Sequence, residues 1–500
     1  MANTTIDNSH KTILKSTGVF GVMQVMKMCV SIVGSKFVAV FLGPVGIGTV
    51  GLLNNTLTII TSISSFGINT TSVREIAIAY NDTDKTKLNQ TIYIIQRITF
   101  VVGLFGAFIA IIFSSLLSKW TFGNTTYYHW FILLSINFVL TSYTSGCVAI
   151  LQGKRMLKII AVSNVISSIV ITLTTVLIYY FYRFEGIVSV ILVSSAIHMG
   201  VNIYFTRSFR TGQIHFDFSE IIQRSLPILK LGFLLSINVI FGHICTFLIK
   251  LYLNGNGATS QVLGYYEVST VILISYVGMI FSSMSIDFYP RLTAINDDNK
   301  KVKELVNNQL EISLLLITPA IVLLYLIAPL VVQLLYTKDF SPVVLILKAA
   351  LFAVIIKSII WPLGFIILAK GNKKQYFKQE LVSDFLNVSL TILLYHSFGL
   401  IGIGIATVVN FALYGFYVYS IVYKKYDFSF RKDTSKIIVF QVCCALICCV
   451  SNFCMDEFYF RIIAGGVFVV SVVYSYITLD KLISFRFYIN KFRNKIIRRK

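Results

Sequence analysis

The sequence predicts an all-α polytopic membrane protein: two six-helix lobes related by internal duplication, followed by two extra C-terminal helices. Of its 500 residues, 56% are hydrophobic and 13% are charged, whereas charged residues make up about 25% of an ordinary soluble chain. The mean hydropathy is +0.79. Apolar stretches of about 20 residues, enough to cross a hydrocarbon core of about 30 Å, follow one another along the chain. An asymmetric distribution of basic residues and an internal repeat complete the prediction.

The apolar stretches predict fourteen transmembrane spans. They lie near 17–42, 46–71, 91–117, 128–150, 158–181, 187–206, 227–251, 264–289, 311–335, 343–368, 379–398, 400–423, 436–455 and 461–480. The polar N-terminus lacks the basic-then-apolar pattern of a cleaved signal peptide, so the first stretch is expected to remain a span. With both termini in the cytoplasm, 34 of the 43 Lys and Arg residues fall in cytoplasmic segments. This distribution follows the positive-inside rule, and it supports the number of spans as well as their orientation.

An internal duplication divides the predicted spans into two lobes. Residues 69–98 resemble 286–315, which aligns Arg74 with Arg291, and residues 150–164 resemble 367–384. Two units of six spans share one orientation, so an axis along the membrane normal should relate them and the substrate path should lie between them. The predicted segments are a cytoplasmic N-terminal segment 1–16, an N-lobe 17–210, a C-lobe 211–425, the extra helices 426–480 and a basic cytoplasmic tail 481–500.

Charge and motif content argue against several classes of function. The net charge of +22 is interpreted as a cytoplasmic collar that faces anionic lipid headgroups, so no nucleic-acid partner is expected. The CC-x-x-x-CC pattern at residues 443–449 favours helix packing over a metal site. The chain has no P-loop, no catalytic constellation and no recurrent metal-ligand spacing, so neither an enzymatic activity nor a cofactor is predicted.

The opening of the chain resembles a known family. A first span with two internal lysines, followed by Phe41-Leu42-Gly43-Pro44-Val45-Gly46, resembles the start of bacterial O-antigen flippases of the Wzx type. Phe122-Gly123-Asn124-Thr125, Leu151-Gln152-Gly153 and Tyr289-Pro290-Arg291-Leu292-Thr293 are similar to that family in the same order. The resemblance covers roughly residues 10–425. It places the chain in the polysaccharide-exporter branch of the multidrug/oligosaccharidyl-lipid/polysaccharide (MOP) exporter superfamily.

The resemblance implies a flippase of the bacterial inner membrane. Such proteins move an undecaprenyl-diphosphate-linked oligosaccharide, an O-antigen or related surface-polysaccharide repeat unit, from the inner to the outer leaflet by alternating access. Membrane lipids, a polysaccharide polymerase and a chain-length regulator are the further partners that it implies. The two extra helices depart from the shorter members of the family.

Basic residues at membrane depth are the first candidates for a substrate site. A diphosphate in a bilayer needs cationic partners, and a charged side chain at the helix centre costs at least about 2.5–3.5 kcal/mol unless a cavity or a partner receives it. Lys27 lies on a polar stripe with Gln24 and Ser31, which favours a cavity over helix pairing. Lys36 and Lys250 either face the cavity or extend to the interface.

Three further basic residues are candidates for the substrate site. Lys357 is the deeper of two lysines in the tenth span. Arg74 and Arg291 occupy matching inner ends of the two lobes, where they either receive the diphosphate or anchor helix ends at lipid phosphates.

Polar and acidic side chains complete the set of candidates. Asn54, Thr58, Thr61, Ser65 and Asn69 recur at near-helical spacing in the second span, and Ser194, His198 and Asn202 do so in the sixth. Such stripes either bind sugar hydroxyls or pack helices together. The candidates for ion coupling are Glu267, Asp287 and Asp384, each of which alternatively neutralises a nearby cation.

Two other functions remain as alternatives. A multidrug antiporter of the same superfamily (MATE-like) predicts carboxylates in the N-lobe cavity, and the first six spans have no acid near their middle. A polysaccharide polymerase or ligase requires a large outer loop, and every predicted outer loop has about a dozen residues or fewer.

Overall fold

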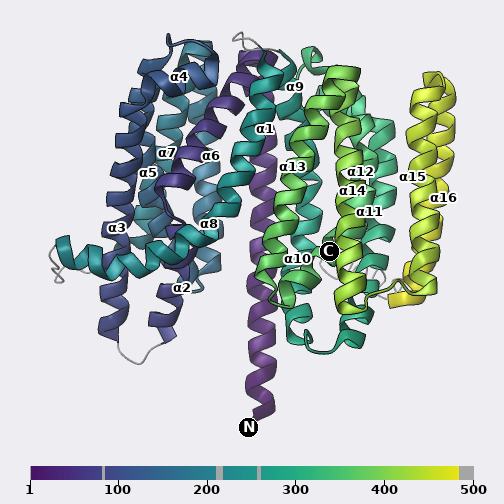
Figure 1. Cartoon of the computed structure of the whole chain (residues 1–500), viewed down its shortest axis with the longest axis horizontal. Coiled ribbons are helices and arrows are strands. Elements are labelled where there is room, and N and C mark those ends of the chain that lie inside the picture. The colour runs from purple at the N-terminus through teal and green to yellow at the C-terminus, as the bar shows by residue number, and fades with distance from the viewer. Residues whose placement is uncertain (1, 82–84, 210–217, 256–260, 484–500) are drawn as a thin grey trace, which may run out of the picture. The chain divides into compact units, whose positions relative to one another are not determined.

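The computed structural model describes the backbone of residues 2–81, 85–209, 218–255 and 261–483, and most of the side chains within them. Throughout these ranges the chain forms helices joined by short turns, with no strand (Figure 1). Because a bilayer core offers no water to unpaired peptide groups, spanning segments must satisfy their hydrogen bonds within the helix. The predicted all-α membrane fold is confirmed.

The helices from the N-terminus to residue 254 are bounded as follows. They are α1 (Ala2–Ser64), α2 (Ile68–Asn81), α3 (Lys85–Ile112), α4 (Ser114–Phe122), α5 (Tyr128–Gly153), α6 (Leu157–Tyr182), α7 (Ile187–Thr206) and α8 (Phe218–Asn254), with short 3-10 turns η1 (Arg183–Gly186) and η2 (Arg207–Phe209).

The later helices begin after residue 260. They are α9 (Gln261–Thr270), the π-helical turn η3 (Val271–Tyr276), α10 (Gly278–Ala294), α11 (Asn299–Leu335), the 3-10 turn η4 (Lys338–Phe340), α12 (Val343–Ala369), α13 (Lys373–Phe398), α14 (Leu400–Tyr426), α15 (Lys432–Cys454) and α16 (Glu457–Ile483).

Twelve helical stretches in the described residues are long and apolar enough to cross a membrane. Two of them exceed a single crossing: Met26–Ser64 has 39 residues and Leu157–Phe209 has 53, against about 20 for one crossing. The first stretch is broken at Gly43, whose φ of 62° is a left-handed conformation before Pro44, and the second joins α6 to α7 through η1. When each is counted as two crossings, the total agrees with the fourteen predicted spans.

The second predicted span ends earlier than expected. It was placed at 46–71, but α1 stops at Ser64 and α2 begins at Ile68. Phe66 and Gly67 have φ values of 46° and 62°, which helical geometry does not allow. Gly232 of α8 packs against this break, and a Cβ atom there would lie 2.2 Å from the Phe66 carbonyl oxygen. The polar stripe along this span is therefore divided between two helices.

The described chain separates into two compact units. The first contains Met1–Gly264 with Leu335–Thr337, and the second contains Tyr265–Leu334 with Lys338–Lys500. The predicted lobes divide near residue 210, whereas compact packing groups α8 with the first unit because α8 contacts α1, α2 and α3. Packing does not report sequence duplication, so the division into duplicated lobes stays a prediction.

Each unit has its own apolar core. In the first unit α5 packs against α3 and α7, and α6 against α1 and α7; Phe131, Phe138 and Tyr179 are fully buried there. In the second unit α12 packs against α14, α15 and α10, around buried Tyr325 and Phe288.

A buried acid attaches the last two helices to the second unit. Glu311 of α11 is 2% exposed, and its carboxylate accepts a hydrogen bond from the Arg431 guanidinium at 2.8 Å and another from the Thr434 hydroxyl. Asn307, one turn earlier, accepts from the Arg431 backbone N–H at 3.0 Å. These contacts fix the start of α15. From there α15 and α16 run side by side (Figure 1).

Candidate functional site

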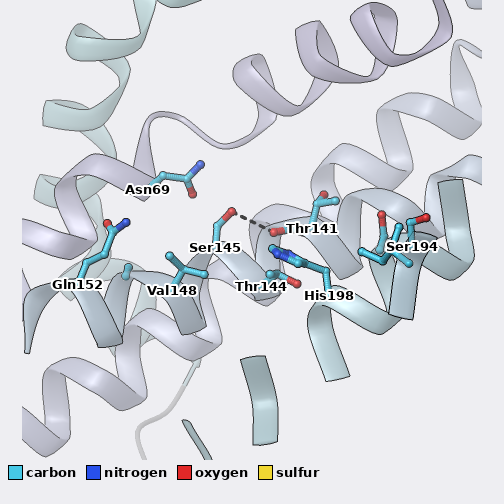
Figure 2. A pocket seen from close by; sticks show the side chains of 11 residues that line it. Asn69, Thr141, Thr144, Ser145, Val148, Gln152, Ser194 and His198 are labelled. Carbon is cyan, nitrogen blue, oxygen red and sulfur yellow. Dashed lines mark hydrogen bonds between the residues drawn. The ribbon is translucent and has the colours of Figure 1, made fainter. Parts of the chain in front are cut away.

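A cavity of about 530 Å³ in the first unit lies between α5 and α7 (Figure 2). Most of its lining is polar and uncharged. The lining residues are Asn69, Thr141, Thr144, Ser145, Val148, Ala149, Gln152, Ile171, Ser194, Ser195 and His198. Thr141, Ser145, Val148 and Gln152 recur every three or four residues, so they share one face of α5. Phe131 and Phe138 lie earlier along the same face, at heptad spacing from Ser145 and Gln152, and belong to the core.

The hydroxyl groups of α5 present oxygen lone pairs to this cavity. Thr141 donates to the Asn137 carbonyl at 2.7 Å, Thr144 to the Leu140 carbonyl at 2.7 Å, and Ser145 to the Thr141 carbonyl at 3.0 Å (dashed in Figure 2). A hydroxyl has one hydrogen and two lone pairs. Since the hydrogen is used within the helix, these side chains remain available mainly as acceptors.

A second cavity of about 430 Å³ adjoins the first and shares Thr141, Ser194 and Ser195 with it. Asn54, Thr58 and Thr61 of α1 line it. Thr58 and Thr61 donate to the carbonyls of Asn54 and Leu57 at 2.7 and 2.8 Å. The two cavities together, which we call the hydroxyl tract, form a polar wall in the first unit with no Asp or Glu among its lining residues.

Lys27 is not among the lining residues of the hydroxyl tract, but it lies near His198, which lines the tract. Its ammonium and the His198 imidazole are close enough to interact electrostatically. The side chain of Gln24, which the sequence places on the same stripe, lies outside the described residues. The first unit thus combines neutral acceptors with a cationic side chain, an arrangement that suits polyhydroxylated or anionic ligands and opposes cationic ones.

The other cationic candidates of the first unit have different surroundings. The Lys36 ammonium donates to the Tyr336 carbonyl. Lys250 is 8% exposed, and its ammonium donates to the Gly51 carbonyl at 3.0 Å, which joins α8 to α1. Arg74 is 60% exposed and lies 3.8 Å from the Glu75 carboxylate. None of the three lines the hydroxyl tract.

The second unit contains a smaller cavity, of about 210 Å³, which we call the aromatic pocket. It lies among α12, α13 and α14. Its lining residues are Lys357, Ile360, Trp361, Gly364, Phe365, Leu368, Tyr376, Gln379, Glu380, Phe411 and Tyr414. The Lys357 ammonium lies 5.4 Å from the Phe281 ring centroid and 5.6 Å from that of Phe411, within the range of cation–π attraction.

Sequence reasoning found Lys357 but not its neighbours in the aromatic pocket. Trp361 follows Lys357 by one turn of α12, and Gln379 and Glu380 open the membrane part of α13. Glu380 lies one turn before Asp384 and close enough to interact with it electrostatically. The i, i+4 spacing of these two acids could have been recognised in the sequence. The packing of α12 against α13 could not.

The remaining acidic and basic candidates lie elsewhere in the second unit. Asp287 and Arg291 form an ion pair of 3.1 Å at the exposed end of α10. Glu267 is half-buried in α9, one helical turn before η3 begins. Among the described residues no group of three or more His, Cys, Asp or Glu side chains is arranged to hold a metal ion.

The comparisons with known proteins agree with this architecture. No curated protein matches the chain in sequence. The solved structure of lipid II flippase MurJ in an inward closed conformation has a TM-score of 0.69 at 16% identity, covering 93% of this chain and 99% of that one. An inward-facing multidrug resistance MATE family transporter of the MOP superfamily has a TM-score of 0.68 at 13% identity, covering 82% and 98%. At these identities the similarity shows the fold.

The family is shown by a separate match. A family model described as "Polysaccharide biosynthesis protein" matches residues 37–345, more than half of the chain. The resemblance to the MOP exporter superfamily is confirmed by this match together with the structural similarities. The chain is a multi-pass membrane protein with the MOP transporter fold, and it belongs to the polysaccharide biosynthesis protein family.

Proposed function

We propose that the protein is a flippase for an undecaprenyl-diphosphate-linked oligosaccharide, an O-antigen or related surface-polysaccharide repeat unit. It acts in the bacterial inner membrane by alternating access, with both termini in the cytoplasm. The hydroxyl tract, with Lys27 near its His198, is the observation that carries the proposal. A lipid-linked saccharide has many hydroxyl donors and a diphosphate, and the tract offers acceptors for the first and a cation for the second.

Lys27 has the central role in this proposal. Its ammonium neutralises the diphosphate while the sugar hydroxyls donate to the oxygens of Thr58, Thr141 and Thr144. A charge at membrane depth costs at least about 2.5–3.5 kcal/mol, and binding an anion there offsets part of that cost. The duplicated lobes alternate between the two leaflets, and the polymerase and chain-length regulator act after translocation.

The acidic residues serve ion coupling in this proposal. Asp384 is the first choice because it is half-buried on α13 and has a second acid, Glu380, one turn away. Asp287 is the weakest choice because Arg291 already pairs with it at the exposed end of α10. Glu267 lies between these two in rank, since it is half-buried next to a π-helical turn, a feature that is frequent at functional sites.

A cation antiporter is the competing function, because a MATE family transporter has a similar fold. The lining of the hydroxyl tract favours a saccharide. An organic cation requires a carboxylate or an aromatic cage, whereas the described lining of the tract has no acid and Lys27 lies near its only imidazole.

Reconstitution tests the proposal directly. The purified protein is placed in vesicles that contain an undecaprenyl-diphosphate-linked oligosaccharide, and an impermeant glycosidase outside measures how much glycan becomes accessible over time. Accessible glycan should rise beyond half in vesicles with protein and remain near half without it. Gradient-driven uptake of ethidium without glycan movement would instead establish the antiporter. In cells, deletion should leave lipid-linked repeat units on the inner leaflet.

A further inference from the structure

The aromatic pocket of the second unit contains two polar atoms without a hydrogen-bond partner. Gln379 is 1% exposed, and neither its Oε1 nor the indole Nε1 of Trp361 has a partner in the described structure. Leaving such a buried group unpaired costs about 1–3 kcal/mol. Both residues line the pocket, so a ligand inside it can supply the missing acceptor and donor. Unpaired groups of this kind are rare in native proteins and call for an explanation.

The Trp361 ring is fixed by its neighbours. Phe288 and Phe365 pack edge-to-face with it at centroid distances of 5.4 and 5.7 Å, and Phe281 does so at 6.0 Å. Edge-to-face pairs of this kind are favourable beyond their buried area. The indole is therefore a rigid part of the pocket wall.

The charges of the pocket exclude most ligand classes. Lys357 disfavours a small inorganic cation, and Glu380 with nearby Asp384 disfavours a diphosphate. An acyl chain would leave the Gln379 Oε1 and the Trp361 Nε1 unpaired and would bury the two charges further. The remaining class is a neutral molecule that has apolar faces and a polar edge with both donors and acceptors.

A pyranose ring has this chemistry. Its C–H faces pack on aromatic rings, and each of its hydroxyls both donates and accepts. The volume of about 210 Å³ is below the 300–1,000 Å³ of pockets for drug-sized ligands, which suits one ring rather than an oligosaccharide. We propose that the aromatic pocket is a subsite for a single neutral sugar ring, with Gln379 and Trp361 as its hydrogen-bonding residues. This inference rests on the proposed saccharide substrate, and it adds a sugar-binding subsite that is separate from the hydroxyl tract.

The fluorescence of Trp361 can report ligand binding in the aromatic pocket. The sequence has three tryptophans, so the Trp120→Phe/Trp130→Phe background leaves Trp361 as the sole emitter in the full-length protein in lipid nanodiscs. The probes are the methyl glycosides of glucose, galactose and N-acetylglucosamine, with sorbitol as a polyol that has no ring. At least one glycoside should shift the Trp361 emission saturably, and sorbitol should not. A response to sorbitol equal to that of the glycosides, or no response to any glycoside, would overturn the subsite.

Paired substitutions separate binding from packing. Gln379→Leu removes the amide whose Oε1 is unpaired and should raise the half-saturating glycoside concentration about tenfold, since tenfold corresponds to about 1.4 kcal/mol. Gln375→Leu lies one turn earlier on α13, outside the pocket lining, and should leave it unchanged. Helical circular dichroism and thermal unfolding confirm that both variants are folded. An equal effect of the two variants, or no effect of Gln379→Leu, contradicts the inference.

The vesicle assay keeps the two proposals distinguishable. If the protein translocates the lipid-linked oligosaccharide while Trp361 responds to no glycoside, the subsite is wrong and the flippase function stands. If Trp361 responds saturably and Gln379→Leu weakens that response in a protein that translocates no lipid-linked oligosaccharide, the subsite stands and the flippase function is wrong.

Discussion

The hydroxyl tract of the first unit and the aromatic pocket of the second differ in almost every chemical property. The tract is large, and its polar lining residues are hydroxyls, amides and one imidazole, with Lys27 close to His198. The aromatic pocket is less than half as large, and it combines five aromatic side chains with a lysine and a glutamate. The two units thus differ in the kind of surface they offer. A tract of acceptors tolerates many arrangements of hydroxyls, whereas a rigid aromatic wall selects one ring.

The largest expected effect comes from Lys27. Lys27→Ala and Lys27→Glu should abolish translocation in vesicles and complementation of a flippase deletion, because the diphosphate loses its cation in a medium of low dielectric constant. Lys27→Arg keeps the charge with a different shape and should retain part of the activity. The control is Lys119→Ala, in α4 outside the tract. Full complementation by Lys27→Ala would show that the first unit does not hold the diphosphate through this residue.

The next effect in size is expected in the aromatic pocket. Lys357→Met should lower the translocation rate roughly tenfold, since a charged hydrogen bond contributes about 1.5–3 kcal/mol. Lys348→Met, nine residues earlier on α12, is the matched control: its ammonium lies 4.5 Å from the Phe460 ring centroid and not in the pocket. Equal translocation rates for the two variants would mean that the aromatic pocket does not contribute to substrate recognition.

Loss of two acceptors in the tract should have a smaller effect. The double variant Thr141→Val/Thr144→Val keeps side-chain shape and removes two oxygens. The half-saturating substrate concentration should rise at least about fivefold, since two hydrogen bonds at about 0.5–1.5 kcal/mol each amount to about 1–3 kcal/mol. Thr174→Val on α6 removes a hydroxyl that donates to its own helix in the same way but lines neither cavity. A rise of the same size in Thr174→Val would assign the effect to helix packing.

The smallest effect on transport is expected at Lys250, where the change should appear in stability. Lys250→Met removes the hydrogen bond from a charged ammonium to the Gly51 carbonyl, and such a bond contributes about 1.5–3 kcal/mol. Thermal unfolding should begin at a lower temperature, while translocation per folded molecule stays at the wild-type rate. A normal unfolding temperature together with a lost transport rate would instead place Lys250 in the substrate path.

Periodicity within one helix was readable from the sequence, and approach between helices was not. Asn54, Thr58 and Thr61 were grouped by their spacing, and they do line one cavity. Hydropathy also predicted the number of crossings, because desolvation of a long apolar stretch is a local property. Boundaries were less exact where backbone geometry decides them, as at Gly67.

The part of the site that the sequence did not predict depends on tertiary contacts. The polar face of α5 from Thr141 to Gln152 became a cavity wall only because α7 stands opposite it. Gln379 and Trp361 lie 18 positions apart and on different helices, so no spacing rule connects them. Lys36 and Lys250 were candidates from depth alone, and each proves to donate to a backbone carbonyl.

The contacts of Glu311 make the last two helices difficult to lose in evolution. A shortened chain that ended after α14 would lack Arg431 and Thr434, and it would keep a carboxylate that is now 2% exposed. An uncompensated buried charge is strongly destabilising, so such a shortening would persist only together with a replacement at position 311. Relatives with twelve helices are therefore expected to have a neutral residue where this chain has Glu311, and relatives with fourteen to keep the acid together with its arginine.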